Sequence, residues 1–228
     1  QSTLTNFRYL TSEWKKNCEE ERLLGVSLTG IMDNDLTNGK KGESNLISAL
    51  EELKKASIET NKEWAKKLKI NESAAITCVK PSGTVSQLVD ASSGIHARHS
   101  EYYIRTVRAD IKDSLCQFMI DKKFPHESDI MKPDSTMIFS FPIQTPPTSV
   151  LRDEMTAIEQ LEHWLVYQRH WCEHKPSITV TVREEEWMDV GAWVYKHFDK
   201  VSGVSFLPHS DHVYKQAPYQ ECTKKEYT

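Results

Sequence analysis

The chain has 228 residues, of which 38% are hydrophobic and 9% aromatic, so it can bury a core of full domain size and is not a disordered or fibrous chain. It carries 29 Lys and Arg against 33 Asp and Glu, a net charge of −4, which predicts a small-molecule partner, with no nucleic acid and no membrane. No apolar run approaches the roughly 18 residues of a membrane span, and the first residues show no signal segment. A cytoplasmic protein is expected.

The cysteines lie dozens of residues apart and include no Cys-x-x-Cys pair, which argues against a disulfide framework and against a zinc knuckle. They are Cys18, Cys78, Cys116, Cys172 and Cys222. Glycine is scarce, with 8 residues, so we expect the glycines to lie where the backbone needs them. Gly83 and Gly94 are the two that matter below.

Along the chain, predicted helices and strands alternate. Thr11 and Ser12 open a charged helix, and Ser44 opens a long helix with apolar residues every three to four positions. Residues 74–80 predict a buried strand that Pro81 stops, and further strands are predicted at 101–108, 136–141, 178–183 and 203–207. Between the third and fourth of these five strands, the spacing from Leu151 to Cys172 predicts a helix of about six turns. This order indicates an α/β sheet or barrel in one partial domain, 1–228.

The segment after the first predicted strand has the order strand, tight turn, helix start. A helix start leaves backbone N–H groups without partners, so the hydroxyls of Ser82, Thr84 and Ser86 beside the bare Gly83 could surround a phosphate. The alternative is that Ser82 or Thr84 only caps the helix and Gly83 only makes the turn. The segment is not a P-loop, because the Gly-Lys-Ser/Thr ending is missing.

Pro-Ser-Gly-Thr-Val-Ser-Gln at 81–87, followed by Ser-Gly-Ile-His at 93–96, resembles the substrate-phosphate loop of ribonucleotide reductase large chains. The resemblance continues through 22–33, 176–182, 185–199 and 203–221, and is nearest to the monomeric triphosphate reductases of the adenosylcobalamin-dependent class II. It implies a ten-stranded α/β barrel of which this chain is the C-terminal half. It also implies that Ser82, Thr84 and Ser86 offer hydroxyls, and Gly83, Thr84 and Val85 offer backbone N–H groups, to the substrate phosphates.

The same resemblance implies thiyl-radical reduction of ribonucleotides, expected to be triphosphates, to deoxyribonucleotides, with adenosylcobalamin as cofactor and a thioredoxin-like or dithiol reductant. The radical cysteine of the family lies in an Asn-x-Cys-x-Glu context, which Asn17-Cys18-Glu19 does not match. We therefore expect no catalytic residue in this chain, an N-terminal half of the same enzyme as its partner, and no activity of the chain alone. The alternatives are a free-standing nucleotide-binding or phosphate-binding module, and the iron-dependent class, whose paired tyrosines near the C-terminus are missing.

Other clusters of reactive residues are weaker candidates. His170, Cys172 and His174 lack the spacing of a zinc site, so no metal is expected. His96 and His99 flank Arg98 and form either a phosphate-facing cluster or a solvated loop. Trp187, Trp193, Tyr195 and Phe198 recur at helical spacing and predict core positions.

Overall fold

The computed structural model describes residues 1–209 and 214–228 and divides the chain into two compact units. The first unit comprises residues 1–97 and 148–209, and the second comprises residues 98–147 with the described part of 210–228. The single partial domain over 1–228 stays a prediction. Of the stretch 203–221, which carries part of the family resemblance, residues 210–213 lie outside the described residues.

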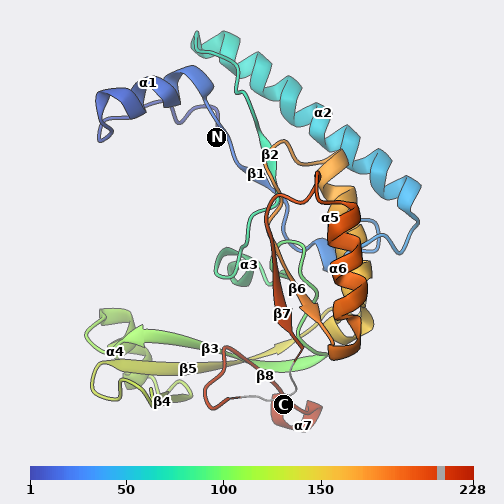
Figure 1. Cartoon of the computed structure of the whole chain (residues 1–228). Coiled ribbons are helices and arrows are strands. Elements are labelled where there is room, and N and C mark those ends of the chain that lie inside the picture. Colours follow the sequence, from blue (N-terminus) through green and yellow to red (C-terminus); the bar gives the residue numbers. More distant parts are fainter. Residues whose placement is uncertain (210–213) are drawn as a thin grey trace. The chain divides into compact units, whose positions relative to one another are not determined.

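The first unit combines helices with short parallel strands. Its α-helices are α1 (Ser12–Glu21), α2 (Glu43–Leu68), α3 (Val85–Leu88), α5 (Ala157–His170) and α6 (Trp187–Lys196). Its 3-10 helices are η1 (Ile31–Asp33), η2 (Arg152–Glu154) and η3 (Glu184–Glu186), and its strands are β1 (Val26–Ser27), β2 (Thr77–Cys78), β6 (Ile178–Val182) and β7 (Val204–Pro208). Helices α2, α5 and α6 lie on one side of the strands, whereas α3 lies on the other side (Figure 1).

The strands of the first unit form two parallel pairs, β1 with β2 and β6 with β7. The segment before β6 is also hydrogen-bonded to β2 and to Val79, the residue that follows β2. The N–H groups of Glu173, His174 and Ser177 donate to the carbonyls of Thr77 and Val79 over 2.9 to 3.0 Å. The order β1, β2, β6, β7 therefore runs through hydrogen-bonded neighbours.

The core of this unit lies between the strands and helices α2, α5 and α6. Helix α5 begins at a capping box in which the Thr156 hydroxyl accepts from the N–H of Glu159, so the helix start is satisfied locally. Trp164 is fully buried on this helix and donates its indole N–H to the carbonyl of Pro176 at 3.0 Å. The other large buried side chains here include Leu46, Leu50, Leu161, Tyr167, Val180, Val182 and Trp193.

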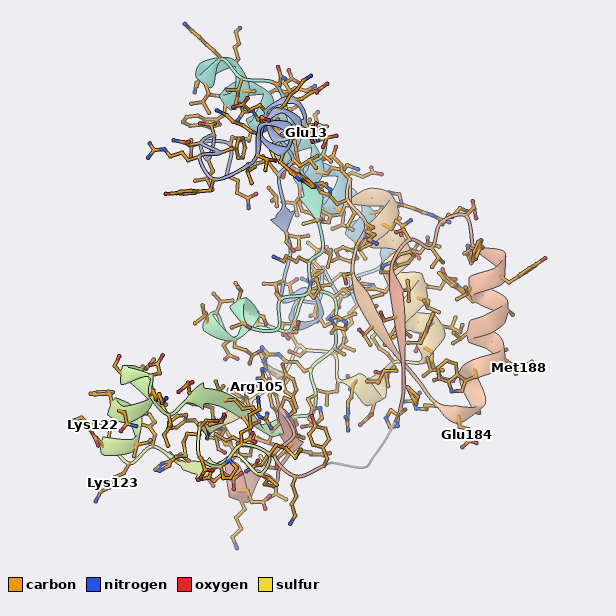
Figure 2. The ribbon with its side chains drawn as sticks, turned by 60° about the vertical axis from the view of Figure 1, so that its left-hand side comes forward. Glu13, Arg105, Lys122, Lys123, Glu184 and Met188 are labelled. Carbon is orange, nitrogen blue, oxygen red and sulfur yellow. The ribbon has the colours of Figure 1, made fainter. Side chains whose placement is uncertain are left out.

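The second unit is an antiparallel sheet in the order β4, β5, β3, β8. Its elements are β3 (Tyr102–Asp110), α4 (Ser114–Asp121), β4 (His126–Ser128), β5 (Thr136–Gln144), β8 (Tyr219–Glu221) and α7 (Lys224–Tyr227). A small core of Cys116, Met137 and Phe139 lies between α4 and the sheet. The lysines that follow α4, Lys122 and Lys123, point away from the sheet (Figure 2).

The five predicted strands are confirmed as β2, β3, β5, β6 and β7, although β2 is only two residues long. The helix expected from Leu151 is wrong in its first turn: residues 152–154 form η2, and α5 begins only after its cap at Thr156. The mixed α/β class is confirmed, but the sheets formed by the described residues are small, with two, four and two strands. The half-barrel stays a prediction.

Helix α6 departs in part from its expected core role. Trp193 is 7% exposed and belongs to the core, as predicted, but Trp187 and Tyr195 are 39% and 87% exposed, and Phe198, just after the helix, is 75% exposed. The helix packs only through the side that carries Val190 and Trp193, so the opposite side is left uncovered. Met188, which is 84% exposed, projects from that outer side (Figure 2). Among the described residues, no helix is both long and apolar enough to cross a membrane.

Candidate functional site

The candidate site is the loop between β2 and α3, which lies on the side of the strands that α2, α5 and α6 leave free (Figure 1). Strand β2 ends at Cys78, and two residues later the N–H of Lys80 donates a hydrogen bond to the hydroxyl of Ser27 at 2.9 Å. Pro81 then ends the ladder, because proline has no N–H to donate. The predicted order of strand, turn and helix start is confirmed.

The tip of this loop presents free backbone donors. Gly83, Thr84 and Val85 are exposed, and in the described ranges their N–H groups have no hydrogen-bond acceptor. A side chain added at Gly83 would meet no atom within 4 Å, so the chain's own packing does not require glycine there. Three adjacent unpaired donors are suited to an anion with several oxygen atoms.

The Ser82 hydroxyl is held inside the loop. It lies 2.7 Å from the Thr29 hydroxyl and accepts the N–H of Gly94 at 3.0 Å. The Thr29 hydroxyl donates to the carbonyl of Ser92 at 2.9 Å, so Ser82 must be the donor in the Ser82–Thr29 pair. The proton of Ser82 is therefore already committed within the protein.

The Ser86 hydroxyl also points inward. The side chain is fully buried, and its hydroxyl donates to the carbonyl of Ser82. The Ser86 N–H donates to the same carbonyl at 3.1 Å, and the Ser86 carbonyl accepts the N–H of Ala91. Of the three hydroxyls that the sequence places at a phosphate, the one at Thr84 is exposed, and the other two hold the loop in shape.

Gly94 fixes the second Ser-Gly turn against the loop. Its φ is +56°, and an added side chain would come within 3.0 Å of the Lys80 carbonyl, so both the backbone conformation and the space require glycine. Its N–H reaches the hydroxyls of Thr29 and Ser82, each at 3.0 Å. The expectation that glycines lie where the backbone needs them is confirmed at Gly94.

Two supporting residues escaped the sequence analysis. Thr29 bonds to Ser82 as described, and Asp33 accepts the N–H of Ser92 at 2.7 Å and the Ser149 hydroxyl at 2.8 Å. Both lie in the 22–33 stretch, which drew attention only through its family resemblance. Their contacts join residues more than 50 positions apart, so no local spacing could have indicated them.

The histidines that the sequence analysis weighed as possible clusters have separate partners. His170 bonds to Glu51 at 2.8 Å, His174 to the carbonyl of Leu24 at 2.7 Å, and Cys172 is buried. Within residues 1–209 and 214–228, no three His, Cys, Asp or Glu side chains could hold a metal ion together. His99 stacks on Tyr219 with the ring centroids 5.7 Å apart.

The cysteines of the chain are all free thiols. Burial raises the pKa of the thiols of Cys78, Cys116 and Cys222 above the ordinary value, and raises that of Cys172 to about 12. Such thiols stay protonated at neutral pH and are poor nucleophiles. None of these four lies in an environment that activates a thiolate.

No protein-family model matches the chain. The fold has a counterpart in a solved structure, described as a B12-dependent (class II) ribonucleotide reductase. This structure matches with a TM-score of 0.79 and 26% identity, over 93% of this chain and 33% of that one. The class of protein to which the chain is similar is therefore the cobalamin-dependent ribonucleotide reductases.

The curated relatives are more specific. Adenosylcobalamin-dependent ribonucleoside-triphosphate reductases match from Euglena gracilis, with 30% identity over 96% of this chain, and from Lactobacillus gasseri, with 26% over 93%. A probable member from Dictyostelium discoideum is 31% identical over 90% of the chain. The chain spans about a third of the length of these relatives (30%, 32% and 27%) and is homologous to that part of them.

Proposed function

We propose that this chain is part of an adenosylcobalamin-dependent ribonucleoside-triphosphate reductase and supplies the loop that holds the substrate's phosphates. The observation that carries the proposal is the row of unpaired N–H groups at Gly83, Thr84 and Val85, with the exposed Thr84 hydroxyl beside them. Phosphate oxygens are strong acceptors, so they would satisfy these donors together. Ser82 and Ser86 contribute by holding the loop.

The parallel strands support a place in a barrel wall. Strands β1, β2, β6 and β7 follow one another through hydrogen bonds, helices cover one of their sides, and the phosphate loop lies on the other side. In an α/β barrel, helices form the outer layer and ligands bind at the loops that follow the strands. We propose that these four strands are wall strands of the ten-stranded barrel in the complete protein.

The remaining parts of the reaction belong to the complete protein in this proposal. A ribonucleoside triphosphate would be the substrate, a thioredoxin-like protein or a dithiol the reductant, and an N-terminal half of the same enzyme the source of the radical cysteine. Adenosylcobalamin supplies radical chemistry when it is bound. Trp193, the aromatic residue most buried on α6, donates its indole N–H to Glu162, an exposed residue of α5, and its ring lies 4.5 Å from that of His197. We assign no residue of this chain to the cofactor.

The phosphate proposal is tested by titrating the full 228-residue chain with inorganic tripolyphosphate and with ATP in a calorimeter. Thr84→Asp places a carboxylate among the free N–H groups, so we expect it to raise the dissociation constant for both ligands at least tenfold, about 1.4 kcal/mol or more. The matched control is Thr60→Asp, which adds the same charge at an exposed position of α2.

Binding of tripolyphosphate that Thr84→Asp weakens and Thr60→Asp leaves unchanged supports the loop as the site. Equal effects of the two variants would show only a response to net charge. No binding by the unmodified chain would contradict the proposal that this loop by itself holds phosphates. Binding of ATP without tripolyphosphate would place the recognition on the nucleoside.

A further inference from the structure

One edge of β6 is satisfied largely by side chains. Strand β7 pairs with one edge, and alternate N–H groups face the other. There Ser177 donates to the Val79 carbonyl at 2.9 Å, and Thr179 donates to Nε2 of His96 at 3.0 Å. Thr181 donates to Oε1 of Gln160 at 3.2 Å. The backbone of the β2 segment is hydrogen-bonded to this edge only as far as Val79. At the next N–H along the edge, that of Thr179, the imidazole of His96 replaces a backbone acceptor.

These contacts define the protonation of His96. A backbone N–H can only donate, so Nε2 must be the unprotonated nitrogen that accepts from Thr179. The proton then lies on Nδ1, which donates to the carbonyl of Ser93 at 2.9 Å. The N–H of His96 donates to the same carbonyl at 2.9 Å, so this residue closes the 93–96 turn twice. One neutral tautomer satisfies every contact of the ring.

The turn that His96 closes is the one that bonds to the phosphate loop. Gly94, at its centre, donates to the hydroxyls of Ser82 and Thr29. A continuous chain of hydrogen bonds thus runs from the edge of β6 through His96 and Gly94 to Ser82. We propose that His96 is a positioning residue that fixes the phosphate loop to β6, an inference that rests on the proposed function of the loop.

The surroundings of His96 favour its neutral form. The ring borders a small cavity of about 70 Å³ that Gln160, Thr179 and Thr181 also line. The charged residue facing this cavity is Arg152 on η2, whose Nε lies 3.6 Å from a carboxylate oxygen of Asp153. Burial lowers the pKa of His96, opposed in part by the bond to Ser93. Protonation would place a second donor against the Thr179 N–H and open this contact.

The test compares three changes at His96 with a control at the same strand edge. His96→Ala removes both ring contacts, His96→Asn keeps a donor for Ser93, and His96→Gln can keep an acceptor for Thr179. Gln160→Ala removes the neighbouring side-chain acceptor, whose hydrogen bonds among the described residues go to Thr156 and Thr181 and not to the 93–96 turn. For each full-length variant, amide hydrogen exchange is measured by NMR at Thr179, Thr181 and Gly94, and tripolyphosphate affinity by calorimetry.

We expect His96→Ala and His96→Asn to lower the protection of both Thr179 and Gly94 at least tenfold and to raise the dissociation constant about five- to tenfold. His96→Gln should restore protection at Thr179. Gln160→Ala should lower protection at Thr181 and leave Gly94 and the affinity unchanged. In the unmodified chain, the protection of Gly94 should fall on acidification, and His96→Gln should flatten that pH profile.

Loss of protection at Thr179 with an unchanged Gly94 would overturn the inference, because His96 would then only complete the strand edge. This exchange readout needs no ligand, so it remains decisive if the unmodified chain binds no tripolyphosphate and the proposed function fails. Conversely, ligand binding that survives His96→Ala and His96→Asn with unchanged affinity would refute the positioning role and leave the phosphate loop in place.

Discussion

The hydroxyl of Ser82 donates to the hydroxyl of Thr29 across 2.7 Å, although the two residues lie 53 positions apart. This bond joins the loop between β2 and α3, which we propose holds phosphates, to the segment after β1, and both oxygens also accept the N–H of Gly94. The shape of the loop therefore depends on a residue that lies outside it.

Replacing Thr29 with valine should loosen the loop. Valine keeps the shape of threonine but removes the hydroxyl, so Ser82 loses its acceptor and Gly94 loses one of its two. We expect a loss of about 1–2 kcal/mol in the free energy of unfolding, measured by urea titration, and faster amide exchange at Gly94. Thr29→Ser restores the hydroxyl and should recover most of the stability. Equal stability of the valine and serine variants would show that the bond contributes nothing.

Substitutions of the loop serines and of Thr84 should differ in their effects on stability: only the serine substitutions should lower the melting temperature, whereas both should weaken tripolyphosphate binding. Ser82→Ala combined with Ser86→Ala removes the internal bonds, so it should lower the melting temperature and raise the dissociation constant for tripolyphosphate at least tenfold. Thr84→Ala removes an exposed hydroxyl that would bond to the phosphate, so it should raise the dissociation constant about tenfold without changing the melting temperature. Unchanged affinity in the double variant would mean that the backbone N–H groups bind without the serine framework.

The chain alone should not reduce ribonucleotides. Hydrogen abstraction needs the family's radical cysteine, and none of the five cysteines lies in an Asn-x-Cys-x-Glu context. We expect no deoxyribonucleotide from the purified chain with ATP or CTP, adenosylcobalamin and dithiothreitol, followed by chromatography of the products. Addition of the N-terminal half from a relative, in trans or as a fusion, is the positive arm. Turnover by the unsupplemented chain would refute the view that it is a part of the enzyme.

Stability should fall in mild acid because of His163. Burial lowers its pKa from 6.5 to about 4, since the ring lies within α5 beside Tyr167. The unfolded chain therefore binds more protons than the native chain between these values. The contribution of the neutral ring is complete above pH 6.5 and is lost as the pH falls toward 4, by about 3 kcal/mol.

His163→Leu, which cannot titrate, is the test for this prediction. Urea titrations at pH 7.5, 6, 5 and about 4 should show a shallower decline of stability in the variant than in the unmodified chain. Parallel declines would assign the acid sensitivity to other groups, among them His96, whose pKa burial also lowers.

Local patterns were sufficient for much of the fold. Strand alternation predicted β3, β5, β6 and β7, and Pro81 after an apolar run predicted the turn, because these features depend on neighbouring residues. The short elements β4, β8 and α7 escaped, since three or four residues carry too little pattern. The start of α5 was misplaced because the apolar spacing continues through η2, whereas the helix begins at the Thr156 cap.

The loop could be located from the sequence alone, by its order of strand, turn and helix start. Its resemblance to the ribonucleotide reductase loop indicated that the ligand is a phosphate. Their separate roles depended on the tertiary structure. Whether a serine hydroxyl faces a ligand or the protein depends on which distant groups compete for its proton. For Ser82 those groups are Thr29 and Gly94, and for the turn that supports it the partner is Thr179 on β6. Such contacts arise only when the chain folds back on itself, so no spacing along the sequence encodes them.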